Sequence, residues 1–178
     1  MHVSTKDQMR LNEAEAFRAF YEEALPRVYS YLFHRCGGVV PVAEDLTQET
    51  FLAAVAEIKK GASVAAPVPW VLGIAKHKLL DHYRRQKRGE REVAMSWEAP
   101  GGDDLPAPDA EDARDRAMEA LGALPASQRA ALVLRYLDGM SVPEVARSLR
   151  KSVHAAESLL ARGRESFKRS YLEANGGG

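Results

Sequence analysis

Basic and hydroxyl side chains gather in one short stretch, positions 150–164, which reads RKSVHAAESLLARGR. Arginine and lysine side chains neutralise nucleic-acid phosphates, and a serine at the start of a helix, together with free backbone N–H groups, can hold another. The middle of the stretch carries Glu157 rather than a further basic residue. A glutamate can accept a hydrogen bond from cytosine N4 in the major groove. The stretch therefore has the chemistry of a DNA-binding helix with phosphate contacts at its edges.

A helix-turn-helix pattern accounts for the position of this stretch. Leu124 and Pro125 open a helix that runs through Leu137, and Asp138 with Gly139 closes it. A Ser-x-x-Glu capping box then predicts a short helix over 142–149, and Ser152 can cap the next helix after a tight turn. That last helix has one apolar stripe at helical spacing, which we expect to be buried: Val153, Ala156, Leu160, Gly163 and Phe167.

The opposite face of the last helix is expected to be exposed, and it carries His154, Ala155, Glu157, Ser158, Leu159, Ala161 and Arg162. We expect Glu157 and Ser158 to face base edges and Leu159 to meet a thymine methyl group. The expected phosphate ligands are Arg150, Lys151, Ser152, Arg162 and Arg164. An ordinary helical hairpin explains the same spacing, and Glu157 can equally face solvent or repel wrong DNA.

Two further stretches, AEDLTQETF at positions 43–51 and PWVLGIAKHKLLDHYRRQKR at positions 69–88, combine polar and apolar residues on helical spacing. In the first, Asp45, Gln48 and Glu49 lie close together beside Leu46 and Phe51. A solvated helix face explains such a cluster equally well, and Phe51 also fits the core. The second ends in basic residues, which also suit the negative end of a helix dipole without any partner.

The charges of the 178 residues are segregated although their formal sum is zero. Residues 1–88 carry 13 Lys and Arg against 10 Asp and Glu, residues 89–116 carry 3 against 9, and residues 117–178 carry 9 against 6. The acidic part contains three prolines and an adjacent glycine pair, which indicates a tether. We therefore predict domains at 11–90 and 113–172, joined by a flexible acidic linker at 91–112.

Helical spacing dominates the whole sequence, so we predict an all-α protein of two small helical domains. The N-terminal domain is expected to hold four helices: about 11–25, a second from Pro26 to the Gly37-Gly38 pair, 42–60 and 69–88. The single cysteine, Cys36, excludes an internal disulfide and favours a reduced, cytoplasmic setting. No signal peptide or membrane span is expected.

Taken in order, these stretches resemble the extracytoplasmic-function (ECF) sigma factors, group 4 of the sigma-70 superfamily of bacterial RNA polymerase sigma factors. AEDLTQETFLAAV is similar to the family's polymerase-binding helix. PWVLGIAKHKLLDHYRRQKR resembles the helix that opens and reads the −10 element. LPASQRAALVLRYLDGMSVPEVARSL resembles the start of the helix-turn-helix domain that binds the −35 element.

The resemblance implies a role for each stretch. The clamp helices of the largest polymerase subunit would contact Asp45, Leu46, Gln48, Glu49 and Phe51. The −10 DNA would lie on Lys76, His77, Lys78, Asp81, Arg84, Arg85, Lys87 and Arg88, with Trp70 either stacking on DNA or packing in the core. The −35 DNA would lie on Arg150, Lys151, Ser152, His154, Ala155, Glu157, Ser158, Arg162 and Arg164. His77 stands where the family often has asparagine, and residues 61–68 match the loop that pockets a flipped base.

The resemblance also implies partners and excludes others. Core RNA polymerase (clamp helices and flap), promoter DNA and an anti-sigma factor are the expected partners, and the regulon would be one of stress or envelope genes. No catalytic residues, cofactor or metal are expected.

Two other interpretations remain open. One is a free-standing helix-turn-helix regulator, which leaves AEDLTQETF unexplained. The other is a metal-dependent enzyme using His34, Cys36, His77 and His82, although these spacings match no compact zinc motif.

Overall fold

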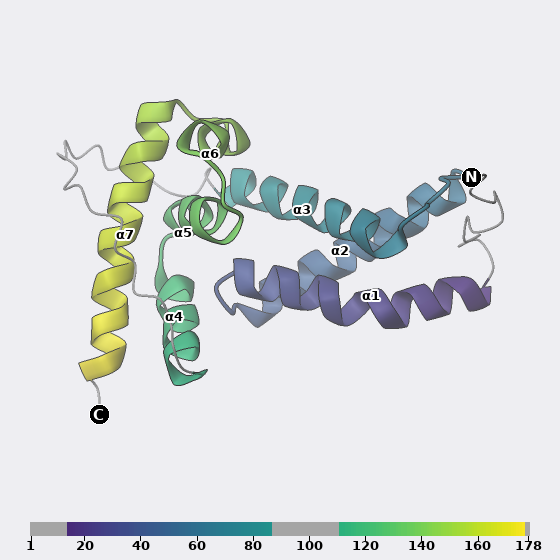
Figure 1. Cartoon of the computed structure of the whole chain (residues 1–178), viewed down its shortest axis with the longest axis horizontal. Helices are drawn as coiled ribbons and strands as arrows, with labels where there is room; N and C mark the ends of the chain where they lie inside the picture. Colours follow the sequence, from purple (N-terminus) through teal and green to yellow (C-terminus); the bar gives the residue numbers. More distant parts are fainter. Residues whose placement is uncertain (1–13, 87–110, 177–178) are drawn as a thin grey trace, which may run out of the picture. The chain divides into compact units, whose positions relative to one another are not determined.

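The computed structural model describes residues 14–86 and 111–176, and Figure 1 shows their helices. No strand occurs among the described residues, which confirms the all-α prediction. These residues form two compact units. We call residues 14–33 with 40–79 the N-terminal unit, and residues 34–39 with 80–86 and 111–176 the C-terminal unit.

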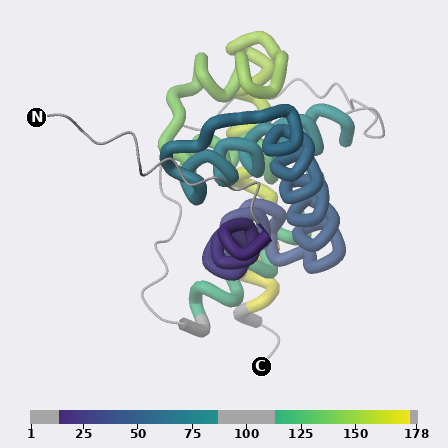
Figure 2. Tube along the Cα trace, turned by 90° about the vertical axis from the view of Figure 1, so that its right-hand side faces the viewer, coloured from purple at the N-terminus to yellow at the C-terminus, as the bar shows by residue number. Residues whose placement is uncertain are grey.

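Three helices supply the first half of the described chain: α1 (Ala14–Arg35), α2 (Val40–Lys59) and α3 (Pro67–Gln86). Figure 2 looks along α1, with α2 beside it. Each helix buries one stripe at three- or four-residue spacing, as an amphipathic helix must. In α1 the buried side chains are Phe20, Ala24, Val28 and Leu32, and in α3 they are Val68, Val71, Ala75, Leu79 and Tyr83.

The predicted helix break at Pro26 is wrong, because α1 runs without interruption from Ala14 to Arg35. A proline inside a helix removes one backbone hydrogen bond and usually kinks or ends the helix. Here Ala24 and Val28, on either side of Pro26, are both completely buried and stay in phase with the same stripe. Burial of one continuous face therefore outweighs the local cost of the proline. The helix ends at Arg35, just before the predicted stop at Gly37 and Gly38, which both adopt positive φ.

The C-terminal unit is built on α7 (Val153–Gly176), which packs along α4 (Glu111–Ala123), α5 (Ala126–Leu132) and α6 (Val142–Leu149). Figure 1 shows α7 running beside these shorter helices. Gly163 of α7 allows a close approach, because a Cβ there would lie 3.1 Å from Leu132 Cγ. The two helices of the predicted helix-turn-helix, α6 and α7, therefore share one core with α4 and α5.

The helix that was expected to run to Leu137 changes geometry in its last turn. After α5 the backbone forms a π-helical segment, η1 (Val133–Leu137), in which the Asp138 N–H donates to the Val133 carbonyl at 3.1 Å. A π turn widens the helix by one residue, and it often occurs at functional positions. It places Asp138 at the end of η1, directly before the turn at Gly139.

Candidate functional site

The turn between α6 and α7 fixes the direction of the predicted DNA-reading helix. The capping-box prediction holds for α6, since the Glu144 carboxylate accepts from the Ser141 backbone N–H at 2.8 Å and from its hydroxyl at 2.7 Å. Arg150 ends α6 in the left-handed conformation, with φ 54°. Ser152 Oγ then accepts from the Ala155 N–H at 3.1 Å and caps α7, as predicted.

The first turns of α7 carry a polar face that is open to solvent. His154 and Glu157 are both exposed, and His154 Nδ1 lies 4.0 Å from Glu157 Oε2. Arg150 and Ser152 are also exposed, whereas Lys151, Ala155 and Ser158 are partly buried. The face can therefore offer an acceptor at its centre and positive charge at its margin, which is the arrangement that base contacts and phosphate contacts require.

Three of the expected positions on α7 are wrong. Leu159 is only 5% exposed and Ala161 is also buried, so neither lies on the polar face, and Leu159 cannot reach a thymine methyl group. Conversely, Val153 was expected inside and is exposed. Because α4, α5 and α6 all pack against α7, the buried face is wider than the single stripe that periodicity indicates.

The two later arginines of α7 already have partners within the unit. Arg162 Nε donates to the Ser158 carbonyl at 3.3 Å, and Arg164 Nη1 donates to the Tyr136 hydroxyl at 3.4 Å. Both side chains are partly buried. The first contact holds the Arg162 guanidinium close to the α7 backbone, and the second directs the Arg164 guanidinium towards η1.

On α2 the predicted polymerase-contacting residues divide into a surface group and a core group. Asp45 and Gln48 are exposed and Glu49 is partly buried. Leu46 and Phe51 are buried, so the expectation that Leu46 anchors a partner does not fit its position. Phe51 packs edge-on against Tyr21 with ring centroids 4.8 Å apart, which places it in the core as the alternative interpretation had it.

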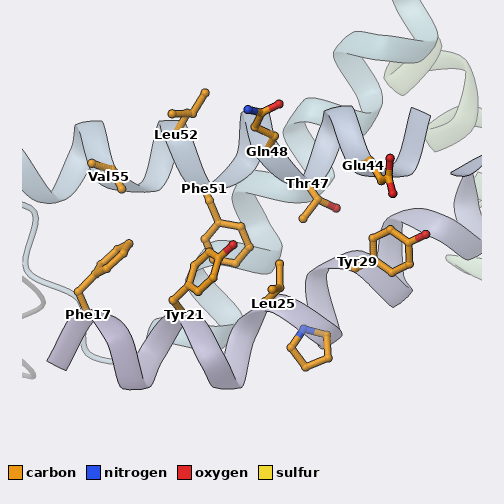
Figure 3. Close-up of a pocket in the computed structure, with 11 residues that line it drawn as sticks. Phe17, Tyr21, Leu25, Tyr29, Glu44, Thr47, Gln48, Phe51, Leu52 and Val55 are labelled. Atoms are coloured by element: carbon orange, nitrogen blue, oxygen red, sulfur yellow. The ribbon is translucent and has the colours of Figure 1, made fainter. Parts of the chain in front are cut away.

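A groove of about 660 Å³ lies between α1 and α2 in the N-terminal unit (Figure 3). In Figure 3, Phe51 points towards Tyr21 on α1, while Leu52 and Gln48 point away from α1. Leu52 is 64% exposed and lines the groove. Most of the lining is apolar: Phe17, Tyr21, Leu25, Pro26, Phe51, Leu52 and Val55, with Tyr29, Glu44, Thr47 and Gln48 completing it.

Neither Leu52 nor the groove was predicted from the sequence, although one signal was available. Leu52 falls outside the buried face of α2, which consists of Ala43, Leu46, Thr47, Thr50, Phe51, Ala54 and Ile58. An apolar residue off the buried stripe is a candidate for an intermolecular contact.

Several predicted −10 residues lie on the solvent side of α3: Lys76, His77, Asp81 and Arg85 are exposed, and Lys78 is partly buried. Trp70 is partly buried against Phe20, with ring centroids 6.4 Å apart, which favours the core interpretation. Arg84 donates from Nε to the Ser148 carbonyl at 2.9 Å and from Nη1 to Asp81 at 3.3 Å. Lys87 and Arg88 lie outside the described residues.

The structure gives no support to the metal-enzyme interpretation. Within residues 14–86 and 111–176, no three His, Cys, Asp or Glu side chains lie close enough to hold a metal ion. Cys36 is buried, and desolvation raises the pKa of its thiol to about 11 although Arg129 opposes the shift. A protonated thiol is a poor nucleophile and a poor ligand. None of the helices described is long and apolar enough to cross a membrane.

Comparison with known protein families gives two matches, in the same order as the motifs. Residues 20–89 match "Sigma-70 region 2", and residues 114–167 match "Sigma-70, region 4". Both matches fall inside the domain boundaries predicted at 11–90 and 113–172, and those boundaries themselves stay a prediction. Together the matches include α2, α3, α6 and the polar face of α7.

Individual proteins match over most of the chain. The ECF RNA polymerase sigma factor SigF of Caulobacter vibrioides is 30% identical over 162 residues, covering 89% of each chain. The ECF RNA polymerase sigma factor BldN of Streptomyces coelicolor is 31% identical over 160 residues, which cover 86% of this chain but 59% of BldN. Among solved structures, the RsbN-BldN complex matches with 27% identity and a TM-score of 0.37, covering 93% of this chain and 99% of that one.

Proposed function

This chain belongs to the ECF RNA polymerase sigma factors, and from that membership we propose that it brings core RNA polymerase to promoters. The observation that carries the proposal is the pair of polar faces, one on α2 and one at the start of α7, each within a matched family region. The basic residues of α3 would supply a third contact. The chain would thus bind polymerase, hold the −35 element and help open the −10 element, without a catalytic site of its own.

The polymerase contact is proposed to combine the acidic face of α2 with the groove beside it. Asp45 and Glu49 offer carboxylates to basic side chains of the clamp helices, and Gln48 offers a hydrogen-bonding amide. Because Leu46 is buried, the exposed Leu52 beside the groove would supply the apolar part of the contact in its place. An apolar anchor that becomes fully desolvated typically contributes more binding energy than rim charges do.

The DNA contacts are proposed to divide into positioning and reading groups. Phosphates would meet Arg150, Lys151, Ser152, Arg162 and Arg164 at the −35 element, and the basic residues of α3 at the −10 element. His154, Ala155, Glu157 and Ser158 would face the −35 bases. Glu157 would accept from a cytosine N4 group.

Three further features of the proposal follow from family membership. The chain would work in the cytoplasm, where RNA polymerase acts. An anti-sigma factor would hold it inactive, and the genes it serves would respond to stress or to damage of the envelope.

Run-off transcription with core polymerase on a library of genomic promoters tests the proposal directly. We expect specific transcripts and two shared promoter elements, and a library without any specific transcript would contradict the proposal.

The polymerase contact is tested with Leu52→Arg, which brings a positive charge against the basic clamp. It should weaken binding of core polymerase at least about tenfold. Ala56→Arg, on an exposed position of the same helix outside the groove, is the matched control.

A further inference from the structure

Gly73 lies in the interior of α3, at an exposed position on the outer side of the helix. Val71 and Ala75, two positions before and after it, are both completely buried. Two residues turn an α-helix by about 200°, so position 73 faces away from the core of the N-terminal unit. A Cβ added there would meet no atom of the described residues within 4 Å. The outer face of α3 is therefore bare backbone at this point, with open space above it.

The packing of α3 does not require a glycine at position 73. Gly61 and Gly139 adopt positive φ, and Gly163 lies where a Cβ would press on Leu132. Gly73 has neither requirement, because it is helical and its surroundings are open. In a helix interior, glycine is the least favourable residue apart from proline. The chain therefore loses helix stability at position 73 and gains no packing from it.

Basic side chains border the bare position on the same face. Lys76 and His77 follow Gly73 by three and four residues, which are the spacings at which side chains become neighbours on a helix surface, and both are exposed. Pro69, also exposed, lies about one turn before Gly73, roughly 6 Å along the axis. We call the bare backbone at Gly73, bordered by Pro69 on one side and by Lys76 and His77 on the other, the α3 notch.

The shape and charge of the α3 notch fit one unit of a sugar–phosphate chain. Lysine neutralises a phosphate as a flexible point charge, so a phosphate on Lys76 brings its sugar over the neighbouring positions of the helix. A side chain at position 73 would occupy the space that this sugar needs. Bare backbone lets a ligand come to van der Waals distance, which is a common use of glycine.

We propose that the α3 notch seats one sugar–phosphate unit of the melted −10 strand, with the phosphate on Lys76 and the sugar against Gly73. This inference rests on the proposed function and adds to it a DNA contact that depends on a missing side chain. The glycine lowers helix stability and permits close contact with DNA. Substitution at position 73 should therefore move stability and DNA binding in opposite directions.

Fluorescence anisotropy of wild-type and variant holoenzymes tests the notch, with the more tightly bound strand of the mapped −10 element as a labelled 12-mer. Gly73→Ala should weaken binding slightly, and Gly73→Leu should weaken it about tenfold, the loss typical of one charge-assisted contact. In urea unfolding both variants should be at least as stable as the wild type, because alanine and leucine favour the helix. Ala56→Leu, at an exposed position of α2, is the matched control and should bind as the wild type does. Equal affinity of Gly73→Leu and the wild type overturns the proposal.

Two further measurements distinguish a sugar–phosphate unit from a base in the notch. Gly73→Leu should make the slope of log affinity against log salt shallower by about 0.7, the value for one phosphate of a single strand. In a Lys76→Ala background, Gly73→Leu should weaken binding much less than tenfold, because the same contact is already lost. A loss of affinity with an unchanged slope would place a base in the notch and overturn the proposal, as would full additivity of the two substitutions. Failure of the proposed function is distinguishable, because run-off transcripts would then be absent, whereas failure of the notch leaves them intact.

Discussion

At the scale of single residues, Arg150 shows how one side chain serves two conflicting demands. It stands in the turn between α6 and α7 with a left-handed backbone, a conformation that costs a non-glycine residue about 1 kcal/mol or more. Glycine would adopt this conformation without strain. Arg150 is exposed and adds positive charge at the start of the proposed −35 face. The chain therefore accepts backbone strain where a charge is useful.

Arg150→Gly should stabilise the protein by about 1 kcal/mol, because glycine adopts this φ without strain, and should weaken binding to −35 DNA. Urea unfolding followed by circular dichroism measures the first effect, and DNA anisotropy measures the second. Arg150→Ala is the control, since it removes the charge and keeps the strain. Equal stability of the two variants would contradict this account.

Glu157 places a negative charge on the proposed −35 face, and a base-preference assay tests its role. If it accepts from cytosine N4, Glu157→Ala should remove about 1–3 kcal/mol of discrimination at one −35 position. Glu165→Ala, exposed and two turns later on α7, should leave every position unchanged. If the base preference is unaltered in Glu157→Ala, Glu157 does not read a base, and it either faces solvent or repels wrong DNA.

At the scale of elements, the packing of α7 depends on the absence of a side chain at position 163. A Cβ at Gly163 would meet Leu132 Cγ at 3.1 Å and Cδ2 at 3.3 Å, so α5 and α7 touch more closely than an ordinary pair of helices. Gly73 on α3 is the opposite case, because a Cβ there would meet nothing within 4 Å. Both are helical glycines, yet their surroundings differ.

Gly163→Val should destabilise the protein by about 1–3 kcal/mol through overpacking against Leu132. Gly73→Ala should stabilise it by up to about 1 kcal/mol, because alanine has the higher helix propensity and meets no clash. Chemical denaturation of both variants gives the comparison. A neutral Gly163→Val would mean that α5 and α7 separate at little cost.

At the scale of the whole molecule, a formal charge of zero hides a basic–acidic–basic order along the chain. Net charge therefore says little about the affinity of this protein for DNA. The local charge on each face decides how many phosphates are neutralised, and the salt dependence of the affinity measures that number. The segment between the family matches adds negative charge to the chain.

Affinity for a duplex carrying the mapped −35 element should fall with salt. Four basic side chains on phosphates, Arg150, Lys151, Arg162 and Arg164, give a slope of log affinity against log salt of about −3.6. Arg162→Ala should make the slope shallower by about 1, whereas Lys168→Ala, exposed late on α7, should not change it. A salt-independent affinity would contradict phosphate binding by this face.

The sequence by itself determined the helical class, the order of the motifs and several helix ends. The helix 142–149 was predicted to the residue, because a capping box and an apolar stripe are local signals. The glycine pair Gly37-Gly38 after α1 likewise predicted the end of this helix, since glycine adopts positive φ without strain.

Only the tertiary structure decided what covers each helix. Periodicity shows which side of a helix faces inward but not how wide the covered face is, so Leu159 was misplaced and Leu52 was overlooked. The uninterrupted α1 depends on burial on both sides of Pro26, which outweighs a local breaker.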